Sequence, residues 1–262
     1  MKRELDARLA NRINSLTGYL NTFRIFLTPE VCRTYILNMF KSKATEKGKA
    51  TKSQLLEISL RLFHQKGFEA ATMREIAAAA DMSLGAFYYY YPSKDSIVLD
   101  YYRQVQDQHA ARVAEHWPEA SDLRRRLGLL MHTKLDILRD SRELMGALLR
   151  YTGNPDHPLS FLGESTRGIR DESIAMFHEA LAPERLPDDM ARILPLLLWA
   201  MQMGILLYFL YDKSKAQTRT KKLTDMALDL TVRMITVARI PIFRPVRKSL
   251  RSLMVEAGLI NS

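Results

Sequence analysis

The chain has 262 residues and a formal net charge of +10, with 47% hydrophobic and 26% charged residues. This length and balance are those of a folded globular protein, and they exclude disordered, collagen-like and low-complexity classes. The single cysteine, Cys32, excludes an internal disulfide framework and has no neighbours at metal-ligand spacing, so we expect a reducing, cytoplasmic location.

The positive charge is concentrated at the two ends of the chain. Residues 1–50 hold ten Lys and Arg against four Asp and Glu, and residues 239–262 hold five against one. The middle of the chain is balanced. The charge therefore supports a polyanionic partner only through the terminal segments. The first fifteen residues lack the apolar stretch of a secretory signal, so we expect no secretion.

Helical periodicity begins near residue 51 and strand-like alternation is almost absent, which predicts an all-α fold. The first helix is expected over 51–67, where apolar residues share one face and Gly67 provides a left-handed stop. A second, short helix is expected to start after Thr72, because Thr72 and Glu75 have the spacing of a capping box, and to run to about Ala79.

A tight turn is expected at residues 80–83, because Asp81 tolerates a left-handed backbone and Ser83 can cap a third helix over 84–90. Pro92 ends that helix, and Ser93 caps a long fourth one that runs to Trp117. Further helices are expected at about 122–139, 141–151, 165–181, 188–212 and 217–238, with a break at 152–158.

Two short helices separated by a four-residue turn match the spacing of a helix-turn-helix. The residues around the turn are more specific than the spacing: KGF precedes TMREIA, and SLGAFYYYYPSK follows it. Over about residues 51–100 the chain resembles the DNA-binding head of the tetracycline-repressor (TetR/AcrR) family of transcriptional regulators. The remainder, with its final pair of apolar helices, is similar to that family's more variable body.

The resemblance implies an N-terminal helix-turn-helix domain at 49–98, here called the head. It is joined by a long helix to a ligand-binding and dimerisation domain at 99–238, here called the body. We expect a basic tail at 239–262. Residues 1–48 form an N-terminal extension with three interpretations: an extra DNA-contacting arm, a disordered tail, or an untranslated stretch upstream of a start at Met39.

Carried over residue by residue, the family pattern makes 84–90 the recognition helix in the major groove of double-stranded DNA. The resemblance implies base-edge contacts from Leu84, Gly85, Ala86 and Tyr89. It implies phosphate contacts, which fix register without reading sequence, from Thr72, Arg74, Ser83, Tyr88, Tyr90 and Lys94.

Structural roles compete with these assignments. Successive helical residues point about 100° apart, so four consecutive tyrosines cannot all face DNA, and Phe87 and Tyr91 are expected to pack in the core. Thr72 is expected both to cap and to contact DNA. Two positions depart from the family pattern. Asp81 replaces a frequent glycine, and Leu84 offers no hydrogen bond, which puts the family's sequence preference in doubt there.

In the body, the resemblance implies a pocket for a small apolar or aromatic effector, although plain core packing is the commoner role of such residues. The candidate lining is Met131, Leu135, Met145, Tyr151, Phe161, Phe177, Trp199 and Met203. A homodimer is expected because the last two helices expose more apolar surface than one subunit covers. The candidate interface is Leu206, Phe209, Leu223, Met226, Leu230 and Met234.

Residues 193–211 contain no charge and are long enough to span a bilayer. A core or dimer helix is the favoured interpretation, because Pro195, Gln202 and Gly204 interrupt the stretch and its neighbours are amphipathic. We therefore expect no membrane partner.

The sequence shows no phosphate loop, metal cluster or nucleophile signature, so we expect neither an enzyme nor a cofactor. His132, His157 and His178 lack metal-ligand spacing. The predicted function is a ligand-responsive transcriptional regulator, by default a repressor released from a palindromic operator by an inducer, with activation left open. The alternative is a helical interaction or membrane-surface protein without sequence-specific DNA binding.

Overall fold

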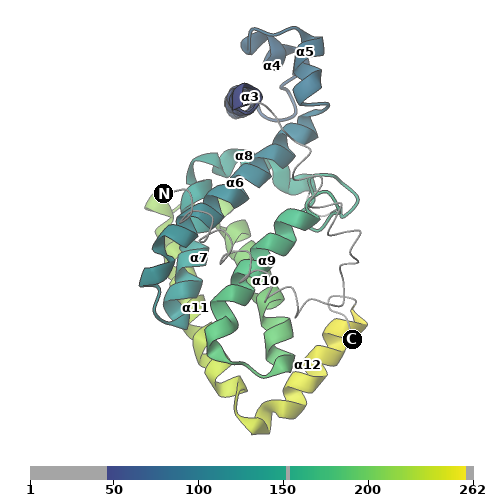
Figure 1. Cartoon of the computed structure of the whole chain (residues 1–262). Coiled ribbons are helices and arrows are strands. Elements are labelled where there is room, and N and C mark those ends of the chain that lie inside the picture. Colours follow the sequence, from purple (N-terminus) through teal and green to yellow (C-terminus); the bar gives the residue numbers. More distant parts are fainter. Residues whose placement is uncertain (1–45, 152–153, 258–262) are drawn as a thin grey trace, which may run out of the picture. The chain divides into compact units, whose positions relative to one another are not determined.

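The computed structural model describes residues 46–151 and 154–257, and every regular element in these ranges is helical, as predicted (Figure 1). Cys32, Met39 and most of the N-terminal extension lie outside the described residues. The helices are α3 (Glu46–Lys66), α4 (Met73–Ala79), α5 (Leu84–Tyr90), α6 (Lys94–His116), α7 (Leu123–Leu138), α8 (Arg142–Leu148), α9 (Arg167–Leu181), α10 (Asp188–Tyr211), α11 (Thr218–Ala238) and α12 (Arg244–Glu256).

The chain divides into two compact units, Met1–Ser53 and Gln54–Ser262, so that α3 begins in the first unit and the helices after it lie in the second unit. Its N-terminal part is the head, where α3 ends at Gly67 with a φ of +83°. The Gly67 N–H donates to the Phe63 carbonyl at 2.9 Å, which closes the helix. Phe63, Ile76, Phe87 and Tyr91 are fully buried, so α3, α4 and α5 share one apolar core.

The head and the body are linked by α6, which starts beside α5 and continues into the body alongside α7 (Figure 1). Its N-terminus carries a capping box, in which Ser93 Oγ accepts from the Ser96 N–H at 3.1 Å. The Tyr91 hydroxyl donates to Asp100 Oδ2 at 2.6 Å. The segment after α5 is therefore tied to the second turn of α6.

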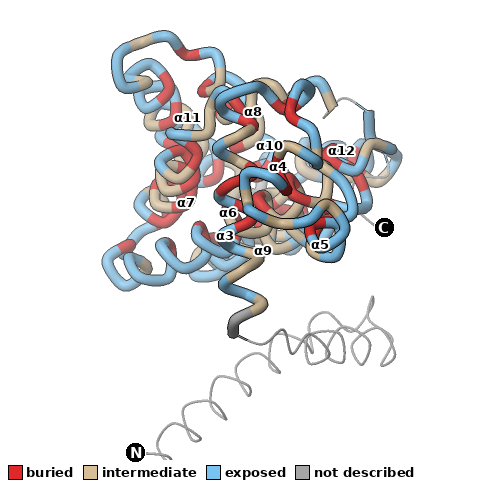
Figure 2. The backbone as a smooth tube through the Cα atoms, turned by 90° about the horizontal axis from the view of Figure 1, so that it is seen from above, coloured by how far each residue is buried: buried red, intermediate tan, exposed pale blue. Residues whose placement is uncertain are grey.

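In the body, α7 packs against α6 on one side and α11 on the other, while α9 packs against α10. Figure 2 shows buried residues gathered on the inward-facing sides of these helices and exposed residues on the opposite sides. Leu127, Leu130 and Phe177 are fully buried in this core. By contrast, α12 is exposed along most of its length, with Met254 as its buried contact.

Within the described part of the chain, α10 is the one helix long and apolar enough to cross a membrane. It packs against α8, α9, α11 and α12, and it buries Leu198, Trp199 and Ile205. The helix thus supplies core contacts to the body. Its outward face keeps Leu197, Leu207, Tyr208 and Tyr211 exposed.

The predicted helix positions agree with the structure to within a few residues, apart from the start of α3 and the end of α8. The first helix begins earlier, at Glu46, and α8 ends at Leu148 with a 3-10 turn over Leu149–Tyr151. The sequence analysis did not foresee α12, which occupies part of the expected basic tail. Its apolar residues Val246, Leu250 and Leu253 follow helical spacing, but they face outward rather than into the core.

Candidate DNA-binding head and effector cavity

The start of α4 is fixed by reciprocal bonds between Thr72 and Glu75. Thr72 Oγ1 accepts from the Glu75 N–H at 3.2 Å, and Glu75 Oε2 accepts from the Thr72 N–H at 2.9 Å. This is the predicted capping box. Lys66 Nζ donates to Glu75 Oε1 at 2.7 Å, and this bond, followed by those from Thr72, lowers the pKa of Glu75 to about 2. The carboxylate thus joins the end of α3 to the start of α4.

The turn between α4 and α5 has the geometry that a helix-turn-helix requires. Asp81 takes a left-handed conformation with a φ of +53°, and the Met82 N–H donates to the Ala77 carbonyl at 2.9 Å. Ser83 Oγ then accepts from the Ala86 N–H at 3.2 Å. Both residues therefore perform the local roles predicted for them, and together they set the direction in which α5 leaves the turn.

One face of α5 is buried and the other is open to solvent. Phe87 is 0% exposed and packs near Tyr91, as predicted, whereas Tyr89 is 85% exposed. Gly85 and Ala86 are also exposed, as are Thr72, Arg74, Ser83 and Tyr88. Leu84 and Tyr90 are half-buried and pack against the head core. The residues assigned to base edges are thus exposed on one helix, except for Leu84.

Lys94, assigned to a phosphate, lies in the first turn of α6. Its Nζ donates to the carbonyls of Phe68 at 2.8 Å and Glu69 at 3.0 Å, and lies 4.8 Å from the centre of the Phe68 ring. An ammonium has three donor hydrogens. Lys94 therefore also holds the segment after α3 in place, a role that the sequence analysis did not foresee.

Between head and body, side chains from the 3-10 turn after α8 contact the head. The Tyr151 hydroxyl donates to Glu69 Oε1, and Arg150 Nη1 lies 3.4 Å from the same oxygen. The Tyr151 ring also stacks on His157 and meets the edge of Phe68. Tyr151, a candidate pocket residue, is therefore placed at the junction of head and body.

The body contains a cavity of about 340 Å³ between α6, α7, α8, α9 and α10. Of the eight candidate pocket residues, four line it: Met145, Phe161, Trp199 and Met203. Three others lie in the buried core and do not line it: Met131, Leu135 and Phe177. Leu206, a candidate for the dimer interface, lines the cavity instead.

The polar groups of the cavity were missed by sequence reasoning. Lys134 Nζ donates to Gln106 Oε1 at 2.9 Å, and Gln106 Nε2 lies 3.4 Å from Met176 Sδ. Burial lowers the pKa of Lys134 to about 7. Burial also lowers the pKa of neighbouring His109, to about 3, and the charge of Lys134 adds to that shift. The feature of the sequence that could have indicated this buried cation is the position of Lys134 between Met131 and Leu135, on the apolar face of a helix.

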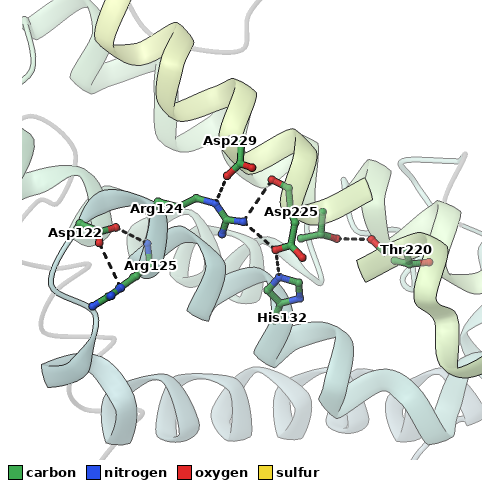
Figure 3. Close-up of polar contacts among 8 residues, drawn as sticks. Asp122, Arg124, Arg125, His132, Thr220, Asp225 and Asp229 are labelled. Carbon is green, nitrogen blue, oxygen red and sulfur yellow. Dashed lines mark hydrogen bonds and ion pairs between the residues drawn. The ribbon is translucent and has the colours of Figure 1, made fainter. Parts of the chain in front are cut away.

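The candidate interface on α11 is an exposed apolar stripe. Leu223, Met226, Leu230 and Met234 are between 41% and 61% exposed. On the other side of α11, Asp225 and Asp229 accept bonds from Arg124 of α7 at 2.9 and 2.6 Å (Figure 3), and both side chains remain about half exposed. A partly solvated charge cluster thus joins α11 to α7, next to the buried contacts of Thr224 and Leu228.

Phe209, another interface candidate, is 3% exposed within the single chain. The guanidinium of Arg142 lies 5.0 Å from its ring centre and donates to the Phe209 carbonyl at 3.0 Å. The side chain is thus held inside the subunit, because α8 packs over this part of α10. The α10 residues that remain exposed near it are Leu207, Tyr208 and Tyr211.

A second hollow, of about 590 Å³, lies between the start of α10 and the C-terminal segment. Its lining is strongly basic, with Asp188 and Asp189 as the acidic residues against Arg192, Arg239, Arg244, Arg247, Lys248 and Arg251. Arg247 Nε pairs with Asp189 at 2.9 Å. Part of the C-terminal positive charge is therefore used to anchor α12. Among the described residues, no group of three His, Cys, Asp or Glu is placed to bind a metal ion.

Comparison with known proteins gives two family matches in consecutive parts of the chain. Residues 55–101 match the model for bacterial regulatory proteins of the tetR family, and residues 126–251 match a tetracyclin repressor-like C-terminal domain. The first match covers the helix-turn-helix, and the second covers most of the body together with most of α12.

Curated relatives share shorter segments. The repressor KstR2 of Rhodococcus jostii is 31% identical over 87 residues, covering 33% of this chain and 43% of the relative. The regulator TtgR of Pseudomonas putida is 28% identical over 103 residues, covering 38% and 49%. The regulator YuxN of Bacillus subtilis is 37% identical over 59 residues, covering 22% and 20%. The matches thus span about a fifth to a half of these relatives.

Solved structures share the fold over a longer stretch. A TetR regulator from Nitrosomonas europaea matches 68% of this chain and 96% of its own with a TM-score of 0.56 and 15% identity. FadR from Bacillus halodurans matches 71% and 96% with a TM-score of 0.55 and 15% identity. From the helix-turn-helix, the helical body and these matches together, the chain belongs to the TetR family of transcriptional regulators.

Proposed function

We propose that this protein is a transcriptional repressor that binds a two-fold symmetric operator as a homodimer and is released by a small-molecule effector. The observation that carries the proposal is the outer face of α5. Gly85, Ala86 and the 85%-exposed Tyr89 share this face, while Phe87 anchors the opposite side in the core. A short helix so exposed can place its first turn in a major groove.

In this proposal the head reads bases through the exposed face of α5 and meets phosphates through the residues around it. Ala86 and the half-buried Leu84 offer apolar contact to a thymine methyl, and Gly85 lets the helix backbone approach closely. The phosphate contacts fix register and come from Thr72, Arg74, Ser83, Tyr88, Tyr90 and the remaining donor of Lys94.

The dimer is supported by the apolar stripe on α11 and the exposed aromatic residues of α10. A surface of this kind on one subunit would be covered by the same surface of a second copy, forming a four-helix interface. Two heads would then read half-sites separated by one turn of DNA, roughly 34–36 Å. The interface residues proposed here are Leu223, Met226, Leu230 and Met234, with Tyr208 and Tyr211 added from the structure.

The effector site is the cavity of the body, which has the size and apolar lining of small-molecule pockets. A related fold, FadR of Thermus thermophilus, was solved in complex with lauroyl-CoA, at a TM-score of 0.50 and 22% identity. Release of DNA requires that the effector bind one body conformation better than another. The protein would act in the cytoplasm, without a membrane partner.

The decisive experiment is a titration of the full chain against DNA from its own upstream region over a series of salt concentrations. A dimer that recognises a specific operator loses affinity steeply as the salt concentration rises. It also binds this DNA at least about a thousandfold more tightly than random DNA. Equal affinity for both DNAs would contradict the proposal. In the alternative function, a membrane-surface protein, the chain would pellet with membranes in fractionation without detergent.

A further inference from the structure

The effector cavity contains positive charge and no negative charge. Lys134 is 6% exposed, and its ammonium donates to the neutral oxygen of Gln106 at 2.9 Å. Arg170 also lines the cavity, and its Nη1 donates to the carbonyls of Phe161 and Gly163 at 3.1 and 3.2 Å. No Asp or Glu is among the lining residues, and neither cation pairs with a described carboxylate.

Placing Lys134 in a buried cavity without an anion raises the free energy of the protein when no ligand is bound. A buried ammonium without an anion loses its hydration and recovers little of it from one amide oxygen. Burial accordingly lowers the pKa of Lys134 to about 7. The groups that face Lys134 from α6 and α9, His109 and Arg170, add no negative charge, and α8 and α10 contribute apolar lining.

The hydrogen-bond donors in the cavity indicate which anionic group could bind there. Lys134 Nζ lies next to the amide of Gln106, whose Nε2 donates only to the thioether of Met176 at 3.4 Å, a weak acceptor. The two oxygens of a carboxylate can accept from an ammonium and a neighbouring amide at once. Apart from Arg170, Thr166 and Ser173, the rest of the lining is mostly apolar and includes Trp199, Met203 and Leu210.

We propose that the effector of this protein is an apolar molecule with a single carboxylate group, which binds Lys134 and Gln106 while the hydrocarbon part lies against Trp199 and Met203. The inference rests on the proposed function, because it takes the cavity to be the effector site. It adds the chemical class of the ligand and identifies Lys134 as the residue that selects it.

The test uses matched pairs of ligands that differ only in the head group. Alkanoates from octanoate to tetradecanoate, and phenylalkanoates, are compared with the alcohols of the same chain length by isothermal titration calorimetry on the full chain. At pH 6.5 the best acid is expected to bind about tenfold or more tightly than its alcohol, since a charge-assisted hydrogen bond is gained. Equal binding of acids and alcohols, or no binding of either class, would overturn the proposal.

Lys134→Met keeps the volume and removes the charge, and it should abolish the preference for acids while leaving alcohol binding in place. Lys222→Met, the same change at an exposed position of α11, should preserve the preference. A second measurement needs no variant. At pH 8, acid binding to wild type should take up close to one proton, measured in buffers of different ionisation enthalpy, and alcohol binding none. Absence of proton uptake would contradict the role of Lys134.

The two proposals can fail separately. If the protein binds its upstream DNA specifically but no acid binds through Lys134, the repressor stands and the carboxylate inference is wrong. If acids bind through Lys134 but the DNA is not recognised, the cavity chemistry stands and the repressor is wrong.

Discussion

The Tyr151 hydroxyl donates a hydrogen bond to the carboxylate of Glu69, joining the end of α8 in the body to the head across 82 positions of sequence. Tyr151 lies two and three positions after Leu149 and Leu148, which line the cavity. Glu69 in turn offers its carbonyl to Lys94. A ligand that displaces the end of α8 therefore has a short physical route to the segment that positions the helix-turn-helix.

Tyr151→Phe removes this hydrogen bond and keeps the ring that stacks on His157. We expect operator affinity without effector to change by less than about tenfold, because a hydrogen bond contributes about 0.5–1.5 kcal/mol and about 1.4 kcal/mol corresponds to a factor of ten. The effector concentration needed for half release should change more than operator affinity does, since the coupling between the sites is altered. Fluorescence anisotropy of labelled operator measures both. Ser121→Ala, which removes an exposed hydrogen bond from Arg125 away from this contact, is the control, and identical effects in the two variants would exclude the route.

Tyr89 and Lys94 are expected to differ in what they contribute to DNA binding. Tyr89→Ala removes an exposed side chain, so it should relax sequence preference by about 1–3 kcal/mol at the contacted base and leave random DNA binding unchanged. Lys94→Ala should weaken binding to all sequences alike and reduce the salt slope by about 1.

Lys94 also bonds to Phe68 and Glu69, so a loss of head stability has to be separated from a loss of DNA contact. Circular dichroism melting of Lys94→Ala and Lys94→Arg provides this control. If Lys94→Ala remains folded and binds operator as wild type does, the assigned docking on DNA is wrong.

The apolar stripe on α11 should determine whether two subunits form a dimer. Replacing Met226 and Met234 by Asp places charges on side chains that are each 61% exposed, so the isolated subunit should remain folded. The proposed dimer would bury these charges without partners and should dissociate, which sedimentation equilibrium can detect. Leu162→Asp, at an apolar residue 52% exposed and outside the stripe, is the matched control. A dimer that survives the double change would rule out this stripe as the interface.

Stability at acid pH should report on Glu75. Hydrogen bonds from Lys66 and Thr72 lower the pKa of its carboxyl from 4.5 to about 2 in the folded protein. Since the folded pKa lies below the unfolded one, the stabilisation is complete above about pH 4.5 and is lost as the pH falls towards 2. Glu75→Gln should unfold at lower urea than wild type at pH 7, and the difference should shrink below pH 4.5. Glu179→Gln, on the exposed side of α9, is the control, and its difference in urea stability from wild type should not depend on pH in this way.

The head was predictable because its determinants are local. The pairs Thr72 with Glu75 and Ser83 with Ala86 are three residues apart, and the left-handed turn is set by Asp81 itself. Side-chain periodicity then predicted the buried Phe87, whereas the outward position of Tyr89 was implied by the family resemblance. Caps and turns of this kind depend on neighbours in the chain, and those neighbours can be read from the sequence.

The body was predictable in its helices but less so in its site. Tyr151 points to the head rather than the cavity, and Phe209 is covered by Arg142, because both positions depend on how α8 packs against distant segments. Lys134 was missed because its partner Gln106 is 28 positions away. Likewise, α12 carries apolar residues on its outer side, so no buried face indicated where it packs.

The acidic residues of α11 have a consequence for the two binding equilibria of this protein. Because Asp225 and Asp229 pair with Arg124 of the same subunit on the side of α11 away from the stripe, a second subunit would meet mostly methionine and leucine at the stripe. Raising the ionic strength should then release the protein from DNA without dissociating the dimer. Dimerisation and operator binding would therefore respond to different conditions in the cell.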